Sequence, residues 1–283
     1  MKTGLYWKGG ALRTIYSTGC DGCYALQGPD GGLCDRRVGG DCLRGSYVSK
    51  QPQRNLEILT RFVNDRRYMG LKNLVDKHNR SYFGLEFSYE TIPNELVPFD
   101  YDTFAAFPGN VEAVVTNLDT GKAEYMEVPR RDEKFLLLQA TCALPLMFPI
   151  YHLDGKPYLD GGASDAIPFR RAFDQGCDRA IVILTKPRNF VRKAEKLQPL
   201  IERKYRQYPN FCQTMRERAE KYNADKEELF ELERQGKVLI FAPDSLHGVG
   251  RIEHNVEKLR LLWGEGYQHG VERMEELESF LGR

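Results

Sequence analysis

The sequence has no long apolar run and almost no net charge. None of its apolar stretches approaches the roughly 20 residues of a membrane-spanning helix, and the N-terminus lacks the charged-then-apolar pattern of a signal peptide. Its 41 lysines and arginines nearly cancel its 40 aspartates and glutamates, so no overall field draws the chain toward nucleic acid or an anionic membrane. We therefore expect a cytoplasmic protein whose partners are set by local sites.

Linkers rich in Pro, Gly and Ser are missing, and so are internal repeats. With 283 residues, of which 41% are hydrophobic, the chain is long enough to bury a sizeable core. We expect one domain over residues 1–283, with the core over roughly residues 1–190 and a helical C-terminal part over roughly residues 190–283.

Strand patterns alternate with helix patterns. The apolar, β-branched runs "AIVIL" at residues 180–184 and "KVLIFAP" from Lys237 are typical of strands covered on both faces, and "VEAVVTNLDTGKAEYMEV" predicts a hairpin. Residues 55–64, 190–235 and 255–281 have helical apolar spacing. These patterns predict a three-layer α/β/α fold with a mainly parallel central sheet.

Four of the seven cysteines crowd into one stretch, at Cys20, Cys23, Cys34 and Cys42. Cys20 and Cys23 have the spacing of half a zinc site, but seven residues separate Cys34 from Cys42, whereas structural zinc sites usually repeat a short spacing. A zinc-binding module is therefore an alternative, and no metal is the main expectation. The scattered cysteines are expected to be small buried residues: Cys142, Cys177 and Cys212.

Two glycine-containing turns could carry chemistry. Asp160 follows an apolar strand pattern and precedes Gly161 and Gly162, which places a carboxylate where it could hold a catalytic hydroxyl, although an ordinary Asp-Gly-Gly turn has the same pattern. Near the N-terminus, Gly9 and Gly10 follow the first apolar stretch, and their backbone N–H groups could face an anion. Neither turn is specific by itself.

Several stretches together give a more specific signal: "SYVSKQP", "FDYDTF", "TNLDTGKAEY", "ALPLMFP", "LDGGASDAIP" and "VILTKP" occur in this order. In this order the chain resembles the patatin-like phospholipase family, in particular its bacterial branch. The resemblance implies an α/β hydrolase of lipid or other acyl esters that uses a Ser-Asp dyad and needs no cofactor. It also leaves peripheral contact with a membrane open.

The resemblance assigns roles to both turns. It implies that Asp160 is the catalytic base, supported by the turn of Gly161 and Gly162, and that the oxyanion hole is formed by Gly9, Gly10, Ala11 and Arg13. Two residues depart from the family pattern in the oxyanion turn, where Ala11 and Thr14 stand at positions that are usually glycine.

The family's G-x-S-x-G nucleophile elbow is missing. Where it belongs, residues 36–40 are Arg-Arg-Val-Gly-Gly. Read one base later, the codons of residues 35–41 are compatible with Ile-Gly-Val-Ser-Ala-Gly, and the opposite shift turns "LYWKGG" at residues 5–10 into Val-Leu-Glu-Gly, the family's usual entry to the oxyanion turn. One hypothesis is that residues 5–45 include two segments read out of frame, in which case residues 20–45 should fit the fold badly.

The competing hypothesis is a catalytically dead pseudoenzyme that acts as a binding or scaffold protein. The nearby Ser46 and Ser49 are poor substitutes for the nucleophile, since neither is expected at a strand-to-helix turn. The five histidines are dispersed, with His152 nearest to a motif. A basic run from Arg188 to Arg206 predicts either a solvated helix face or contact with anionic head groups.

Overall fold

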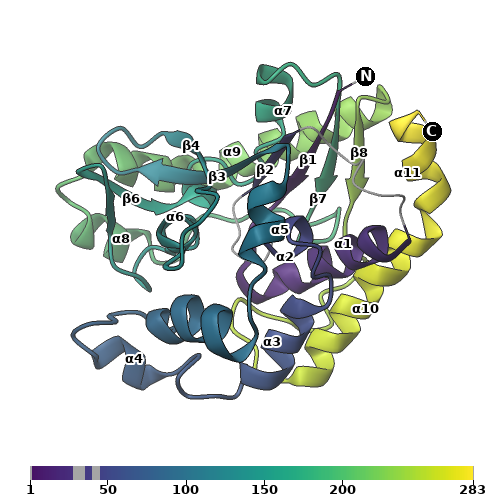
Figure 1. The fold of residues 1–283 in the computed structure, drawn as a ribbon. Helices are drawn as coiled ribbons and strands as arrows, with labels where there is room; N and C mark the ends of the chain where they lie inside the picture. The colour runs from purple at the N-terminus through teal and green to yellow at the C-terminus, as the bar shows by residue number, and fades with distance from the viewer. Residues whose placement is uncertain (1, 28–35, 40–44, 283) are drawn as a thin grey trace.

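The computed structural model describes the backbone of residues 2–27, 36–39 and 45–282, and the side chains of residues 2–23 and 45–282 (Figure 1). Within these ranges one eight-stranded sheet has the order β5-β6-β3-β2-β1-β7-β8, with β4 paired to β3. The strands are β1 Thr3–Trp7, β2 Arg36–Gly39, β3 Asn110–Asn117, β4 Ala123–Glu127, β5 Tyr151–Leu153, β6 Lys156–Asp160, β7 Arg179–Ile183 and β8 Val238–Phe241.

The sheet is mainly parallel. Strands β3, β2, β1, β7 and β8 all run in one direction, while β4, β6 and β5 are antiparallel to their neighbours. The continuous apolar runs of β7 and β8 are fully buried, as expected for parallel strands covered on both faces. The predicted hairpin is β3–β4, and Gly121 in its turn has a φ of +70°, which glycine adopts readily.

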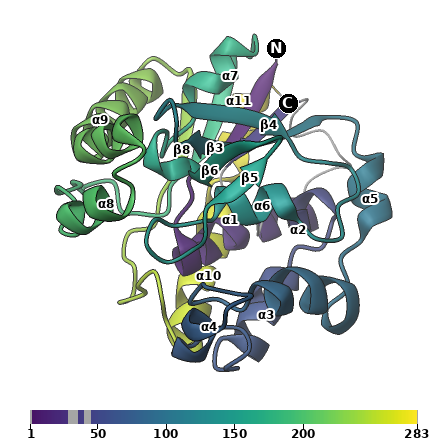
Figure 2. The same ribbon diagram turned by 90° about the vertical axis from the view of Figure 1, so that its left-hand side faces the viewer.

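Helices cover both faces of the sheet (Figures 1 and 2). Leu5 and Trp7 of β1 point into a core shared with α1 Ile15–Gln27, α3 Arg54–Phe62, α10 Val256–Glu272 and α11 Met274–Leu281. Tyr6, between them, points to the other face, which α7 Arg170–Asp174 and α9 Pro209–Arg234 cover. The fold is therefore the three-layer α/β/α arrangement predicted from the sequence, and the C-terminal helices share its core.

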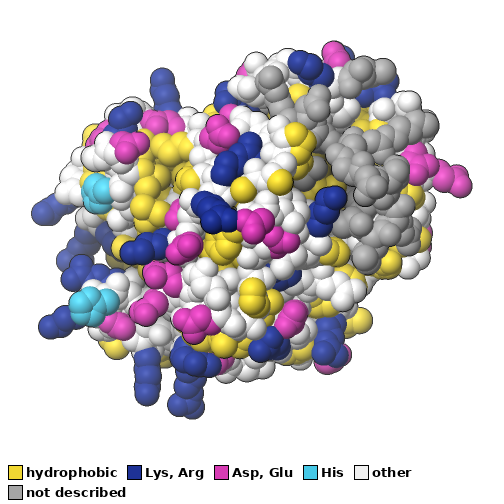
Figure 3. Space-filling model, viewed as in Figure 1, with side chains coloured by type: hydrophobic (Ala, Val, Ile, Leu, Met, Phe, Trp, Pro, Cys, Tyr) yellow, Lys and Arg dark blue, Asp and Glu magenta, His cyan; other side chains and the backbone are white. Residues whose placement is uncertain are grey.

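A third apolar cluster surrounds β3 and holds the remaining helices around the antiparallel strands. These are α2 Gly45–Val48, α5 Tyr101–Ala106, α6 Leu136–Thr141 and α8 Gln198–Lys204. The short α4 Leu71–Val75 and the π-helix η3 Phe87–Leu96 complete the lower part of the view in Figure 1. Acidic and basic side chains are interspersed over most of the face shown in Figure 3, in keeping with the balanced composition. No helix in the described ranges is long and apolar enough to cross a membrane.

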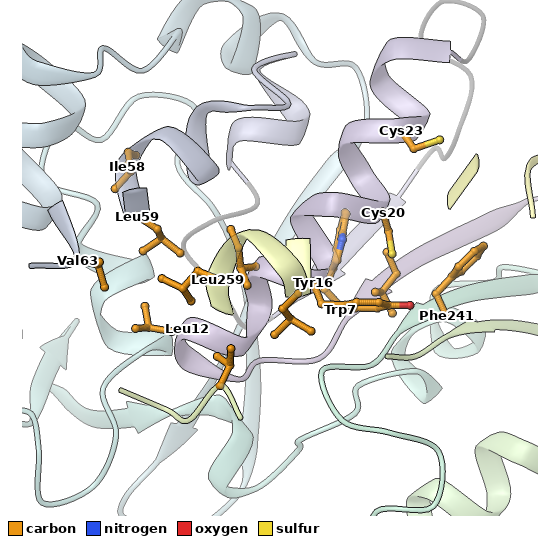
Figure 4. Packing of buried hydrophobic residues seen from close by; sticks show 14 of the residues in the cluster. Trp7, Leu12, Tyr16, Cys20, Cys23, Ile58, Leu59, Val63, Phe241 and Leu259 are labelled. Carbon is orange, nitrogen blue, oxygen red and sulfur yellow. The ribbon is translucent and has the colours of Figure 1, made fainter. Parts of the chain in front are cut away.

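Helices α1 and α10 approach each other very closely. A Cβ added to Gly19 would lie 2.1 Å from the carbonyl oxygen of Trp263, and one added to Gly266 would lie 2.1 Å from that of Tyr16. Cys20 and Cys23 of α1 are buried in the core, and Cys20 lies beside Tyr16 (Figure 4). The small residues of α1 therefore allow a close helix–helix contact.

This packing corrects one expectation. Residues 20–23 fit the fold well, because Cys20 and Cys23 are buried in the core and the neighbouring Gly19 is the small residue that the contact with α10 requires. In addition, Trp7 Nε1 donates to both carboxylate oxygens of Asp21, at 2.9 and 3.0 Å, in a buried contact between the two stretches that the out-of-frame hypothesis would replace. Residues 28–35 and 40–44 lie outside the described part of the chain.

Candidate active site

The carboxyl end of β2 lies close to the end of β6. Strand β4 pairs with residues 112–116 of β3, so it occupies one edge of β3 along both the segment that pairs with β2 and most of the segment that pairs with β6. Strands β2 and β6 must therefore share the other edge, end to end. Gly39, the last residue of β2, is opposite Ala113, and Asp160, the last residue of β6, is opposite Val115. Because two residues along a strand span about 7 Å, the carboxyl ends of β2 and β6 lie about 7 Å apart along this edge of β3.

Asp160 is held firmly at this junction. Its N–H donates to the carbonyl of Ala143 at 2.9 Å, and its carboxylate accepts a 2.6 Å hydrogen bond from the N–H of Gly162, which caps the 3-10 turn η4 Gly161–Ala163. A Cβ on Gly161 would lie 2.1 Å from the carbonyl oxygen of Val114, so only glycine fits there. Asp160 thus ends β6, and the glycine turn that the sequence indicated follows it.

The predicted oxyanion turn follows β1. The N–H of Lys8 donates to the carbonyl of Ile183 at 2.9 Å, and the hydroxyl of Thr185 donates to the carbonyl of Gly9 at 3.2 Å, which ties the turn to the strand beside it. From Ala11 the chain forms the 3-10 helix η1 Ala11–Thr14, which leads into α1. No hydrogen bond runs from the N–H of Gly10 or Ala11 to another described residue. Both donors are therefore available to a ligand.

Ala11 has a φ of +52°, in the left-handed region that glycine adopts without strain. This is the position where the family pattern has glycine. We expect Ala11→Gly to raise the free energy of unfolding by about 0.5–1 kcal/mol, because the relief of backbone strain exceeds the added entropy of the unfolded chain. Urea titration would measure the change. Ala219→Gly in the middle of α9 is the matched control and should lower stability by about 1 kcal/mol; equal losses from both substitutions would contradict the strain at Ala11.

A single cavity brings the two turns together. It is lined by Gly9, Gly10, Ala11 and Arg13 from one turn and by Asp160 and Gly162 from the other. The volume of the cavity is about 190 Å³. Much of the remaining lining is apolar and includes Ile58, Phe83, Phe99, Phe135, Leu144 and Phe148. Two aromatic pairs in this lining are in contact, Phe83 with Phe148 and Phe99 with Phe135. The predicted site residues other than Gly161 therefore share one mostly apolar cavity.

The same cavity contains a group of cations: Lys8, Arg13, Lys186, Arg192, Arg218 and Arg251. Burial, together with the neighbouring cations, lowers the pKa of Arg13 to about 10, that of Arg218 to about 10 and that of Lys186 to about 8. Lys8 is buried and donates to the carbonyl of Gly9 and the hydroxyl of Thr185. The sequence had pointed only to Arg13 and, within the basic run, to Arg192.

A second carboxylate in the lining has a structural partner. Asp165 accepts a 2.5 Å hydrogen bond from the hydroxyl of Tyr125, and burial raises the pKa of Asp165. Because this carboxylate is engaged by a phenol, Asp160 is the better candidate for a base.

The serines near the elbow are not in the cavity lining. Ser46 lies within α2, is buried, and donates from Oγ to Oδ1 of Asn55 at 3.0 Å. Ser49 follows α2, and its Oγ donates to Oε1 of Gln51 at 2.9 Å. Both hydroxyls therefore have structural roles.

The zinc alternative gains little from the described residues. Burial raises the pKa of Cys20 well above its usual value and that of Cys23 to about 11, which disfavours the thiolates that bind metal. Cys34 and Cys42 lie outside the described residues.

The histidines are less dispersed than the sequence indicated. Side-chain ligand atoms of Asp244, Glu265 and His269 lie within 4.8 Å of one another. His247 contacts Glu265 at 2.6 Å, and Nδ1 of His269 is 2.9 Å from the hydroxyl of Tyr16. These contacts tie the loop after β8 to α10 and α1. His152, by contrast, is exposed on β5.

Comparison with known proteins finds two family models and two similar proteins. Residues 45–173 match the family model for patatin-like phospholipases, and residues 208–282 match a domain of unknown function (DUF6363). The chain is 28% identical over 155 residues to the uncharacterised protein YjjU of Escherichia coli (strain K12). The matched region covers 50% of this chain but only 40% of that relative. The crystal structure of VipD from Legionella pneumophila resembles 99% of this chain and 67% of that one, with a TM-score of 0.48 and 10% identity. Residues 45–173 are therefore similar to the patatin-like phospholipases.

Proposed function

We propose that the cavity is the active site of a lipid acyl hydrolase that works through a Ser-Asp dyad, in a chain whose present sequence lacks the serine. The observation that carries this proposal is the end-to-end placement of β2 and β6 on one edge of β3, which brings the carboxyl end of β2 within about 7 Å of Asp160. In this family a nucleophile elbow lies between such a strand and a helix. Here the candidate elbow, residues 36–40, overlaps β2, and α2 begins at Gly45, a few residues after β2 ends. The hydrolase role and the dyad both come from the resemblance to the family, and this geometry supports the dyad.

The proposed reaction uses both turns. A serine at the end of β2 attacks the ester carbonyl carbon while Asp160 accepts the hydroxyl proton. The N–H groups of Gly10 and Ala11 bind the oxyanion of the tetrahedral intermediate. The proton then passes to the leaving alcohol, and a water molecule, deprotonated by Asp160, hydrolyses the acyl-enzyme. Arg13, the third residue of η1, supports the turn.

The apolar lining of the cavity suits the acyl chain. Buried aromatic and aliphatic side chains exclude water from an alkyl group at about 25 cal/mol per Å² of apolar surface removed from water. The family's lipid substrates have such a chain. An alkyl chain in this part of the cavity would leave the ester near Asp160 and Gly10, which line the same space.

Two features bear on whether the serine is missing in the protein or in the reading of its gene. Residues 15–23 of α1 pack well with the sequence as written. For this stretch, the packing favours a genuine pseudoenzyme and not a shifted reading frame. Strand β2, however, carries the sequence Arg-Arg-Val-Gly between two parallel strands, where apolar sequences are usual, and this favours a shifted frame there. Nucleotide sequencing over residues 5–45 decides; codons at Val38 and Gly39 without T-C-G across their boundary exclude the shifted serine.

Hydrolysis by two forms of the protein tests the proposal. We expect the chain as written to hydrolyse a medium-chain aryl ester no faster than the uncatalysed background rate, because Asp160 has no serine hydroxyl to activate. Replacing residues 35–40 with Ile-Gly-Val-Ser-Ala-Gly should raise the rate by about three orders of magnitude or more. The control has Ala in place of the new serine, and spectrophotometric release of the phenol is the measurement. Equal rates with serine and with alanine would overturn the dyad.

A further inference from the structure

We propose that the cavity selects lipids whose head group is a phosphomonoester dianion, and that the C-terminal segment matching the domain of unknown function supplies part of this anion site. The inference rests on the proposed function for the acyl chain, but it does not require hydrolysis. It concerns five cations of the lining: Arg13, Lys186, Arg192, Arg218 and Arg251. We call this group the cation cluster.

The cation cluster is assembled from distant parts of the chain. Arg13 lies in η1, Lys186 follows β7, and Arg192 lies in the loop before α8. Arg218 comes from α9 and Arg251 from the loop before α10, both within residues 208–282. Electrostatic repulsion couples Arg251 to both Arg13 and Arg218, so the C-terminal segment brings its charges into the same space as the N-terminal turn.

The cluster has unused hydrogen-bonding capacity. Nε of Arg13 and Nε of Arg192 are buried and have no hydrogen-bond partner among the described residues. Within the same residues, no ion pair reaches Arg13, Lys186, Arg192 or Arg251, and the carboxylate of Glu195 is 3.9 Å from Arg218. A buried donor without a partner costs about 1–3 kcal/mol, so these groups are poised to bind an acceptor.

The other cations of the lining differ in this respect. Lys8 donates to the carbonyl of Gly9 and the hydroxyl of Thr185. Arg54 donates to the carbonyl of Val97 at 2.8 Å and stacks over Phe99. Their donors are used within the protein, which is why we do not count them in the cation cluster. Arg218 also donates from Nε, to the carbonyl of Gly162 at 2.8 Å, but we count it because its Nη1 has only the carboxylate of Glu195 nearby, at 3.9 Å.

The charge balance of the cavity calls for a multivalent anion. Asp160, Glu195 and Asp165, whose carboxylate accepts from Tyr125, face five cations. The pKa of Lys186 is lowered to about 8 by burial and by Arg13, Arg251 and Arg192, in that order. A phosphomonoester carries about 1.5–2 negative charges at pH 7 and offers three acceptor oxygens, which suit guanidinium groups. A choline head group would bring a positive charge into the cluster. The cavity should therefore discriminate between lipids by head-group charge.

Binding to the chain as written tests this inference without catalysis. We would compare octyl phosphate, octylphosphocholine and inorganic phosphate by isothermal titration calorimetry at pH 7. The two amphiphiles have the same alkyl chain and differ in the charge of the head group. We expect octyl phosphate to bind at least tenfold more tightly than octylphosphocholine, because only the former is a dianion, and more tightly than inorganic phosphate, because the apolar lining takes its chain.

Variants locate the site. Arg251→Gln and Arg192→Gln should each weaken octyl phosphate binding at least fivefold, whereas Arg206→Gln, an exposed arginine between α8 and α9, should leave it unchanged. Arg251 is also exposed, so its substitution should not disturb folding, and thermal unfolding checks both variants. Equal affinity for the two amphiphiles, or binding insensitive to Arg251→Gln, would overturn the inference. If octyl phosphate bound no more tightly than inorganic phosphate, the lipid assignment would be overturned and the site would be one for free phosphate. All these results are independent of whether the serine-bearing form hydrolyses esters.

Discussion

Replacing Asp160 with Asn in the serine-bearing protein should lower kcat by about two to four orders of magnitude, the usual scale for removing a general base. The amide keeps the size of the side chain and its oxygen can still accept from the N–H of Gly162, so the turn should remain folded. What is lost is the ability to accept the serine proton. None of the described residues that line the cavity is a histidine, so none of them can take over this step.

Asp154→Asn is the matched control for this experiment. Asp154 lies in the β5–β6 turn just before β6, is exposed, and has a φ of +49°, which Asn tolerates well. It changes the same chemical group on the same hairpin without touching the cavity, so the rate of ester hydrolysis should stay near that of the parent. If Asp160→Asn retained near-normal turnover, the base would have to be sought elsewhere in the cavity.

Gly266→Ala should lower the free energy of unfolding by about 3 kcal/mol, at the upper end of the usual cost of overpacking. The added Cβ would lie 2.1 Å from the carbonyl oxygen of Tyr16 and 3.2 Å from the backbone nitrogen of Cys20. Because both neighbours are backbone atoms of α1, neither can rotate away, and the two helices must separate. Urea titration followed by circular dichroism measures the loss.

Gly264→Ala, on the same helix, should have the opposite effect. Nothing lies within 4 Å of a Cβ at this position, so the substitution should add up to about 1 kcal/mol of helix propensity. If the two variants were equally stable, α1 and α10 would not be packed as closely as described. The pair also tests whether the C-terminal segment and the N-terminal helix unfold together.

Most of the fold could be predicted because its signals are local. The apolar runs of β7 and β8, the hairpin turn at Gly121 and the spacing of α3, α9 and α10 are each contained in one stretch of sequence. Asp160 and the turn at Gly10 could be predicted for the same reason, since a motif surrounds each of them. Helix α1 gave no such signal. Its buried face contains glycines and cysteines, whose small size matters only beside α10, 240 residues or more away in sequence.

The cation cluster could not be predicted from local patterns. Arg13, Lys186, Arg192, Arg218 and Arg251 stand in five separate segments, and nothing in the sequence around Arg218 distinguishes it from the solvated arginines of the same helix. Only the packing of α9 beside η4, where Arg218 Nε donates to the carbonyl of Gly162 at 2.8 Å, turns this side chain inward. Long-range packing therefore determines the charge of the cavity.

The shared edge of β3 separates the architecture of the site from its reactivity. Strand β4 holds β3 on one edge, β6 holds its end on the other, and the Asp160 turn is fixed by Ala143 and Gly162, so the position of the carboxylate depends little on the four residues of β2. A lineage could lose or regain the serine at the end of β2 while the cavity beside it persisted. In such a fold, the proposed hydrolysis and the proposed lipid binding depend on different residues. Selection can therefore retain lipid binding after hydrolysis has been lost.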